Sequence, residues 1–357
     1  MPEREKTDLH NEWTAADLEK IAAIEQTRQR NFAILDTYSR YLNEAPCFVT
    51  PDLMEEMTQH YGLTTNEAYL LLFANACGAD PQEGKVAQTY IDDYIRPSLC
   101  QLSPIQYAGN PYSQHIHIPD CKFGRWRLGQ EHYAPYEAFI WKDLTVTADY
   151  REIPNIGYFC EEFHFPAVFE DGREWMSVKP NEVETIQPAV DKASGKVVAF
   201  GLGLGYFAYM ASEKEVVDSV TIVERDPDVI QLFRQIILPQ FSHPEKVMVV
   251  QADAFDYAER LMPQQHFSFA FVDLWHDAAD GVPLYRKMKR LEHCSPSTCF
   301  EYWVEDTLLS HLRWTHFSQI TDALRHRSDS LLGIHSCEEV KRQLGNKYLR
   351  EWAKSNF

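Results

Sequence analysis

The chain of 357 residues carries a formal net charge of −19 at pH 7, and 45% of its residues are hydrophobic. This length accommodates two domains or one elaborated domain, and so negative a protein is not expected to bind the phosphates of a long nucleic acid. No segment approaches the roughly 18 consecutive apolar residues of a membrane span, so a membrane is not expected as a partner either. Polar residues 1–30 and eight cysteines without a C-x-x-C pair predict a cytoplasmic protein with free thiols.

The first 112 residues are predicted to form a helical cap. Apolar residues recur at helical spacing in four segments, and Thr50 before Pro51 is typical of an N-cap followed by a first helical residue. The expected helices cover residues 13–41, 51–61, 66–76 and 86–95. We expect this cap either to close over a substrate or to serve packing and the formation of a homodimer.

Residues 113–179 change to a period near two and are predicted to form a β-rich connector. The segment His115–Ile118 and the segment Lys122–Leu128 are expected to pair across Pro119–Asp120. Farther on, Asp171–Gly172 separates two β-rich runs, which is a strong hairpin signal.

Four side chains in this connector also suggest a metal site. Alternating histidines on a strand point to one face, but no carboxylate or second histidine pair stands at firm metal spacing. We therefore predict no metal for this set, and whether it binds another ligand stays open: His115, His117, Cys121 and His132.

Residues 180–357 are predicted to form a Rossmann-like α/β domain, a mostly parallel twisted sheet with helices on both faces and a helical tail. The apolar run Lys196–Phe200 is typical of a buried strand, and Gly201, Gly203 and Gly205 follow at alternate positions before a helix. Glycines allow positive φ and close approach of the backbone to a ligand. Tyr206 stands where the dinucleotide pattern G-x-G-x-x-G requires its third glycine, so the pattern is G-x-G-x-G.

Polar residues follow the ends of the next three predicted strands, which cover residues 219–223, 247–250 and 267–272. Glu224 lies about 20 residues past the glycines, where such folds place a carboxylate on ribose hydroxyls. Asp253 and Asp273 follow the other two strands. Because ligands bind outside the carboxyl ends of parallel strands, one site is expected at this edge. A fifth strand over residues 298–304 and helices over 308–324 and 337–354 complete the prediction.

The G-x-G-x-G pattern and the order of these strand ends resemble the class I S-adenosylmethionine (SAM) methyltransferases. This resemblance implies SAM as cofactor, with the second strand end on the ribose, the third on the adenine amino group and the fourth near the methionine amino group. The implied cofactor-binding residues are Gly201, Gly203, Gly205, Glu224, Arg225, Asp253, Ala254 and Asp273.

The sequence Trp275-His276-Asp277 provides the candidate catalytic residues. His276 is the candidate base, because histidine as a residue type can exchange a proton near neutral pH. Asp277 would orient it or bind a cationic substrate, and Trp275 would stack on a planar substrate or attract the sulfonium. The alternative is that Trp275 packs against the sheet edge and His276 faces solvent.

Residues 165–292 also resemble the polyamine aminopropyltransferases, the spermidine-synthase family, in the hairpin, the Pro180–Glu182 helix start and the glycine strand. Two departures favour methyl transfer. Leu202 and Leu204 stand between the glycines without an acidic residue, and the segment Asp273–Asp277 is one residue longer than the family's gatekeeping sequence. The sequence therefore predicts methyl transfer to a small molecule. The alternatives are aminopropyl transfer from decarboxylated SAM and a non-catalytic SAM-binding scaffold or sensor.

Overall fold

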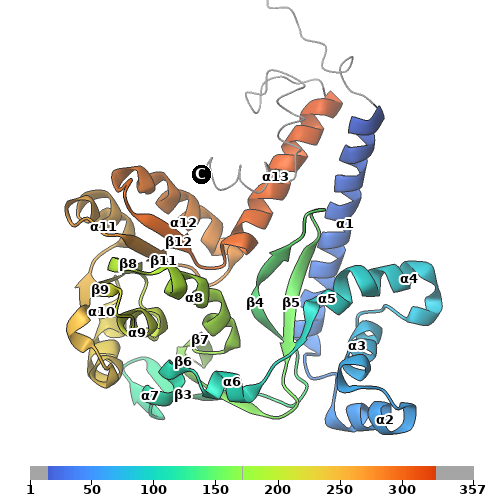
Figure 1. Cartoon of the computed structure of the whole chain (residues 1–357), viewed down its shortest axis with the longest axis horizontal. Coiled ribbons are helices and arrows are strands. Elements are labelled where there is room, and N and C mark those ends of the chain that lie inside the picture. Colours follow the sequence, from blue (N-terminus) through green and yellow to red (C-terminus); the bar gives the residue numbers. More distant parts are fainter. Residues whose placement is uncertain (1–14, 171, 327–357) are drawn as a thin grey trace, which may run out of the picture.

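A five-stranded parallel sheet forms the core of the C-terminal half of the chain, in the order β10-β9-β8-β11-β12 (Figure 1). The computed structural model describes residues 15–170 and 172–326. The strand order changes direction between β8 and β11, which is the switch point where open α/β sheets bind ligands. This arrangement confirms the predicted Rossmann-like α/β fold. The strands are β8 (Gly195–Phe200), β9 (Val217–Glu224), β10 (Val247–Gln251), β11 (Phe269–Val272) and β12 (Cys299–Tyr302).

Helices cover this sheet, and its central strands are buried. Val198 of β8 and Val272 of β11 have no exposed surface, as expected for parallel strands with helices on both faces. The helices are α8 (Pro180–Lys192), α9 (Tyr206–Ser212), α10 (Pro227–Leu232), α11 (Ala254–Arg260), α12 (Ala278–Leu291) and α13 (Glu305–His326). Short helical turns extend them at η4 (Phe233–Ile237), η5 (Leu238–Gln240), η6 (Pro244–Lys246), η7 (Met262–Gln264) and η8 (Glu292–Cys294).

The N-terminal part is mainly helical, as predicted. The Thr50 hydroxyl accepts a hydrogen bond from the Leu53 amide at 3.3 Å, and Thr64 forms a reciprocal capping box with Glu67. Such caps satisfy amides that have no partner within the helix. The elements are α1 (Ala15–Glu44), α2 (Pro51–Tyr61), α3 (Thr65–Ala76), η2 (Pro81–Glu83), α4 (Lys85–Tyr90), η3 (Ile91–Ile95), α5 (Arg96–Ser98), α6 (Pro104–Ala108) and α7 (Pro111–His115).

Two smaller sheets lie between these parts of the chain. One has the order β1-β5-β4 and the other β2-β3-β6-β7. The hairpin predicted around Gly172 is confirmed, because β6 and β7 pair antiparallel on either side of it. The strands are β1 (Leu99–Gln101), β2 (Cys121–Phe123), β3 (Trp126–Tyr133), β4 (Phe139–Val146), β5 (Glu152–Tyr158), β6 (Phe163–Glu170) and β7 (Arg173–Ser177).

The predicted pairing of His115–Ile118 with Lys122–Leu128 is wrong. Asn110 caps α7 by accepting from the Tyr112 amide at 2.9 Å, and Pro111 occupies the first helical position. These two residues start a helix that ends at His115. The segment 122–128 instead contains a tight turn between β2 and β3, and β3 pairs with β6.

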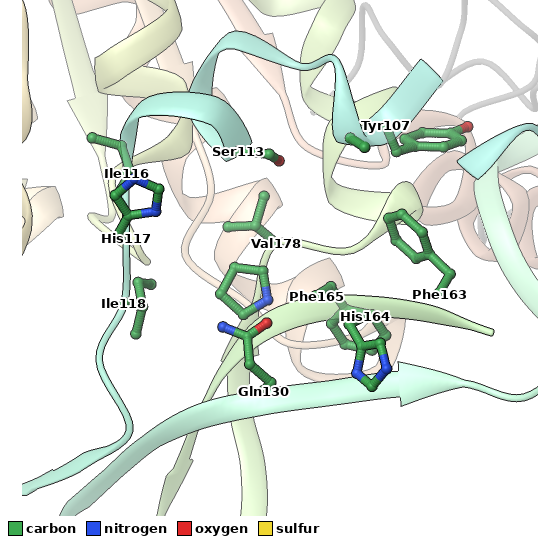
Figure 2. Close-up of a pocket in the computed structure, with 12 residues that line it drawn as sticks. Tyr107, Ser113, Ile116, His117, Ile118, Gln130, Phe163, His164, Phe165 and Val178 are labelled. Atoms are coloured by element: carbon green, nitrogen blue, oxygen red, sulfur yellow. The ribbon is translucent and has the colours of Figure 1, made fainter. Parts of the chain in front are cut away.

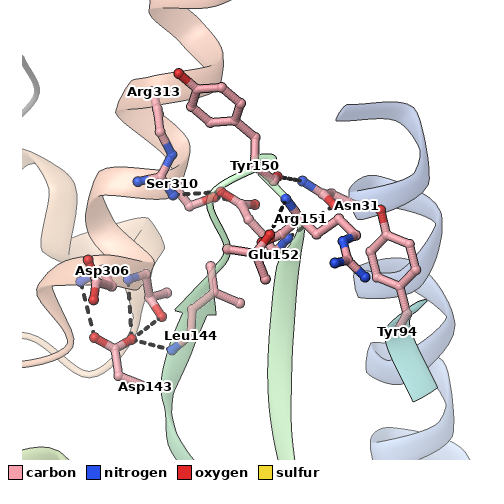
Figure 3. A network of polar contacts seen from close by, with 12 residues as sticks. Asn31, Tyr94, Asp143, Leu144, Tyr150, Arg151, Glu152, Asp306, Ser310 and Arg313 are labelled. Atoms are coloured by element: carbon pink, nitrogen blue, oxygen red, sulfur yellow. Dashed lines mark hydrogen bonds and ion pairs between the residues drawn. The ribbon is translucent and has the colours of Figure 1, made fainter. Parts of the chain in front are cut away.

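A buried polar network joins β5 to α13 and α1 (Figure 3). The Glu152 carboxylate accepts from the Arg313 guanidinium at 2.6 Å and from the Ser310 hydroxyl at 2.8 Å. On its other side, the Asn31 side chain of α1 donates to the Tyr150 carbonyl and accepts from the Glu152 amide. Glu152 and Arg313 are 0% and 1% exposed. Their ion pair fixes α13 on β5, and the hydrogen bonds of Asn31 fix α1 beside the same strand.

The remaining predictions concern membrane spans, the cysteines and the C-terminal helix. Within the described residues, no helix combines the length and the apolar character that a bilayer crossing requires. The seven cysteines in the described part of the chain are free thiols. The helix predicted over residues 337–354 lies outside the described residues.

Candidate functional site

The glycine-rich turn after β8 has a backbone that only glycine adopts without strain. Gly201 has φ +98°, and a Cβ atom there would lie 2.0 Å from the Asp273 carbonyl oxygen. Gly205 has φ +75°, and a Cβ atom there would lie 2.5 Å from the Phe233 ring. Gly203 also has positive φ, but a Cβ atom there would have no neighbour within 4 Å. The turn is therefore packed at both ends and open in the middle.

Glu224, at the end of β9, holds this turn. Its Oε2 accepts from the Leu202 amide at 3.2 Å, and its Oε1 accepts from the amides of Arg225 and Asp226 at 2.8 and 2.9 Å. The structure thus brings together the glycine turn and the carboxylate predicted to bind the ribose. A carboxylate has about four acceptor positions, so these three bonds leave capacity for a hydroxyl. Arg225 itself is exposed.

The end of β10 lies directly beside Glu224. The Ala252 amide donates to the Glu224 carbonyl at 3.0 Å. Asp253 caps α11, because its Oδ1 accepts from the amides of Phe255 and Asp256 at 2.9 and 3.0 Å. Ala254 is buried at the start of that helix. Because Oδ1 caps the helix, the predicted contact of Asp253 with the adenine amino group would be made by its second carboxylate oxygen, Oδ2.

Asp273 follows β11, and its backbone contacts the glycine turn. Its amide donates to the Phe200 carbonyl at 2.9 Å, and its own carbonyl lies against Gly201. Burial, and then the negative charge of Glu182, raise the pKa of the Asp273 carboxyl well above its usual range. The carboxyl groups of Asp273 and Glu182 therefore interact electrostatically beside the switch point of the sheet.

Glu182 belongs to the first turn of α8 and was not among the residues predicted from the sequence. Its pKa is raised to about 7, mainly by burial; the Lys179 ammonium acts in the opposite direction, and the Glu174 carboxylate adds to the rise. Lys179 donates to Glu174 at 2.6 Å. The only sequence signal was the Pro180–Glu182 helix start in the resemblance to the aminopropyltransferases, because the partner residues lie on other elements.

A second missed residue is Arg125, in the turn between β2 and β3. Its guanidinium contacts the carboxylates of Asp226, which caps α10, and of Glu170 at the end of β6. It also lies 4.4 Å from the centroid of the Trp126 ring. Arg125 thus ties the small antiparallel sheet to the loop that follows Glu224.

The three predicted catalytic residues directly precede α12. Asp277 caps this helix by accepting from the amides of Ala279 and Asp280, and the Asp280 carboxylate accepts in return from the amides of His276 and Asp277. His276 and Asp277 are exposed. This placement gives Asp277 a structural role in addition to the predicted catalytic one.

Trp275 is only 5% exposed and packs in the core. A Cβ atom on Gly281 would lie 2.9 Å from its ring, so α12 passes directly over the indole. The predicted stacking of Trp275 on a substrate would require the ring to leave this packing.

The four side chains considered for a metal do not share one strand face. His115 ends α7, where its ring nitrogen contacts the Pro111 carbonyl, and His117 follows in an extended segment. Cys121 lies on β2 and His132 on β3. In the part of the chain that the structure describes, no cluster of three or more His, Cys, Asp or Glu side chains is suited to hold a metal ion.

The fold and the strand-end groups define a Rossmann-like domain with a polar site at its switch point. No protein-family model and no curated protein matches this chain. Among solved structures, similarity is found to spermidine synthase from Thermotoga maritima, with 14% identity, a TM-score of 0.28 and coverage of 36% of this chain and 45% of that chain. A spermidine synthase in complex with the transition state analogue AdoDATO gives 15% identity, a TM-score of 0.29 and the same coverage.

A protein provisionally named a caffeoyl-CoA O-methyltransferase, from Staphylococcus aureus, gives 16% identity and a TM-score of 0.26, over 45% of this chain and 66% of that chain. The chain thus spans less than half the length of the two spermidine synthases. At these scores, the case for function depends on the site itself.

Proposed function

We propose that this protein binds SAM at the carboxyl ends of β8, β9, β10 and β11 and transfers its methyl group to a small molecule. One observation carries the proposal: Glu224 accepts a hydrogen bond from the glycine turn, and the Asp273 carbonyl contacts Gly201. Three strand ends thus form one connected surface at the switch point of the sheet, where a nucleoside ligand is expected.

The residues present fit such a cofactor. The open space beside Gly203 admits a ligand against the backbone. In this proposal Glu224 accepts from ribose hydroxyls and Asp253 accepts from the adenine amino group. The Asp273 carboxyl, which interacts with that of Glu182, is suited to an ammonium group, because a cation relieves the repulsion between two partly buried acids.

SAM would supply an electrophilic methyl group on a sulfonium, which an acceptor takes by in-line displacement. The task of the chain is then to align the acceptor, exclude water and remove its proton. Glu182, with a pKa of about 7, is suited to accept that proton near neutral pH. His276 remains the candidate base predicted from the sequence.

Calorimetric titration of SAM into the protein tests the cofactor. We expect Glu224→Gln to weaken binding by about tenfold to a hundredfold, which corresponds to about 1.5–3 kcal/mol for hydrogen bonds to a charged group. Asp218→Asn is the matched control, because Asp218 is an exposed acid at the opposite end of the same strand. Equal affinity of the Glu224→Gln variant and the wild type would remove Glu224 from the site.

Formation of S-adenosylhomocysteine from SAM in the presence of pooled metabolites tests the transfer. Glu182→Gln and His276→Ala identify the base, since the variant that lowers kcat while SAM affinity is retained has lost proton removal. SAM binding without product from any acceptor would favour the scaffold or sensor alternative.

A second candidate function is aminopropyl transfer from decarboxylated SAM to an amine. The acidic group formed by Glu174, Glu182 and Asp273 favours it, because amines are cations at neutral pH. Titration of decarboxylated SAM beside SAM separates the two candidates. Tighter binding of decarboxylated SAM, followed by transfer to a diamine, would replace methyl transfer as the proposed reaction.

A further inference from the structure

A cavity of about 340 Å³ lies between the α6–α7 segment and the sheet of β3 and β6, apart from the strand ends described above (Figure 2). This volume is within the range of small-molecule sites, roughly 300–1,000 Å³. None of the candidate cofactor-binding residues lines it. The lining residues are Tyr107, Ala108, Ser113, Ile116, His117, Ile118, Gln130, Phe163, His164, Phe165, Pro166 and Val178.

The cavity has an apolar floor and a polar rim that includes His117 and His164. Ile116, Phe165 and Val178 are 4%, 4% and 5% exposed and form the floor. Figure 2 shows Ser113 of α7 and Gln130 of β3 on opposite walls. Their hydroxyl and carboxamide can each donate and accept a hydrogen bond. No lysine, arginine, aspartate or glutamate is among the lining residues.

The wall that carries Ser113 is anchored at both ends. The buried Tyr112 hydroxyl donates to the Leu204 carbonyl of the glycine turn at 2.6 Å. Farther along the chain, Gln240 accepts from the His117 amide at 2.8 Å and donates to the His117 carbonyl at 3.1 Å. The cavity is therefore preformed, which reduces the ordering that binding would require.

We propose that this cavity binds a neutral, planar aromatic molecule that carries an amide or hydroxyl group. The aromatic ring would contact the apolar floor, and Gln130 and Ser113 would bind the polar group. A charged ligand is disfavoured, because it would lose hydration and no lysine, arginine, aspartate or glutamate in the lining would pair with it, while His164 already contacts the Glu162 carboxylate at 2.6 Å. The site is distinct from the proposed cofactor site and adds a second small molecule to the function of the protein.

Three probes with the same ring test this proposal: benzamide, benzoate and benzylamine, which are neutral, anionic and cationic. Titration is followed by ligand-observed NMR or calorimetry on the full chain without cofactor, so the result does not depend on the transferase proposal. We expect benzamide to bind at least about tenfold more tightly than either charged probe, a difference of about 1.4 kcal/mol. Equal affinities, or no benzamide binding at millimolar concentration, would overturn the proposal.

Two substitutions locate the bound probe. Ser113→Trp fills the cavity and should abolish benzamide binding, whereas Gln114→Trp places the same ring on the exposed neighbour outside the cavity and should leave the affinity unchanged. Gln130→Ala removes one polar partner at the rim and should weaken binding about threefold to tenfold. The Gln130→Ala variant keeps the test decisive if Ser113→Trp destabilises the protein and lowers its melting temperature. Benzamide affinity unchanged in Gln130→Ala and in a folded Ser113→Trp would place the probe elsewhere.

Discussion

Replacing Glu182 with glutamine should stabilise the folded protein at pH 8 and leave its stability nearly unchanged at pH 5. Burial raises the pKa of this carboxyl from 4.5 to about 7. Between these two pH values the folded protein therefore binds more protons than the unfolded chain, and the free energy of unfolding falls as the pH rises. Each pH unit changes it by about 1.4 kcal/mol, so the group costs about 3 kcal/mol by pH 8. Glutamine has nearly the same shape and carries no charge, so it avoids this cost.

The neighbouring acid strengthens the expected effect. The negative charge of Glu182 is the second cause of the raised pKa of Asp273, after burial. Removing that charge lowers the pKa of Asp273 toward its usual range and reduces the cost of ionising this second carboxyl. The gain at pH 8 should thus be at least as large as the value for Glu182 alone.

Urea unfolding at pH 5, 6, 7 and 8, followed by tryptophan fluorescence, measures this difference. Asp191→Asn is the matched control, because it removes one negative charge from an exposed position on the same helix. The control should follow the pH dependence of the wild type, while Glu182→Gln gives a flatter curve. Parallel curves for the wild type and Glu182→Gln would refute the inference that these carboxyls share a desolvated space.

Three further substitutions test other parts of the structure. Gly201→Ala places a Cβ atom 2.0 Å from the Asp273 carbonyl oxygen and imposes positive φ on alanine, so it should destabilise the fold by about 2–4 kcal/mol and abolish cofactor binding, as measured by thermal melting and calorimetry. Arg313→Met leaves the fully buried Glu152 carboxylate unpaired and should cost about 3–5 kcal/mol in urea unfolding, much of which Glu152→Gln in the same chain should restore. Tyr112→Phe removes a buried hydrogen bond of 2.6 Å to the glycine turn and should cost about 1–3 kcal/mol, with weaker SAM binding than in the wild type; unchanged affinity would separate α7 from the cofactor site.

The Rossmann-like core could be predicted from the sequence because its signals are local. A buried strand, a turn and a helix start follow one another within a few residues at Lys196–Tyr206, and the same sequence of signals recurs at Glu224 and Asp253. Parallel strands bring their carboxyl ends to one edge whatever the details of packing. The meeting of Glu224 with the glycine turn follows from this rule.

Contacts between distant segments could not be predicted in this way. The pair Glu182 and Asp273 joins the start of α8 to the end of β11, and Arg125 reaches Asp226 from a different sheet. The residues that flank each of them in the sequence give no sign of these contacts. The pKa of a carboxyl depends on burial and on charges from other elements, and neither is visible before the chain is folded.

The segment Trp275–Asp277 shows why residue type alone misleads at a strand end. A histidine between a tryptophan and an aspartate has the chemistry of an active site, but the same residues also meet the needs of local structure. Asp277 satisfies the first amides of α12, and Trp275 fills the space over which Gly281 passes. A helix that starts after a strand requires such a cap and such packing whether or not a ligand binds. Among the acids at this edge, Glu182 and Asp273 are therefore the stronger candidates for a chemical role. Burial raises the pKa of each carboxyl at a cost in stability, and such perturbed groups are typical of functional sites.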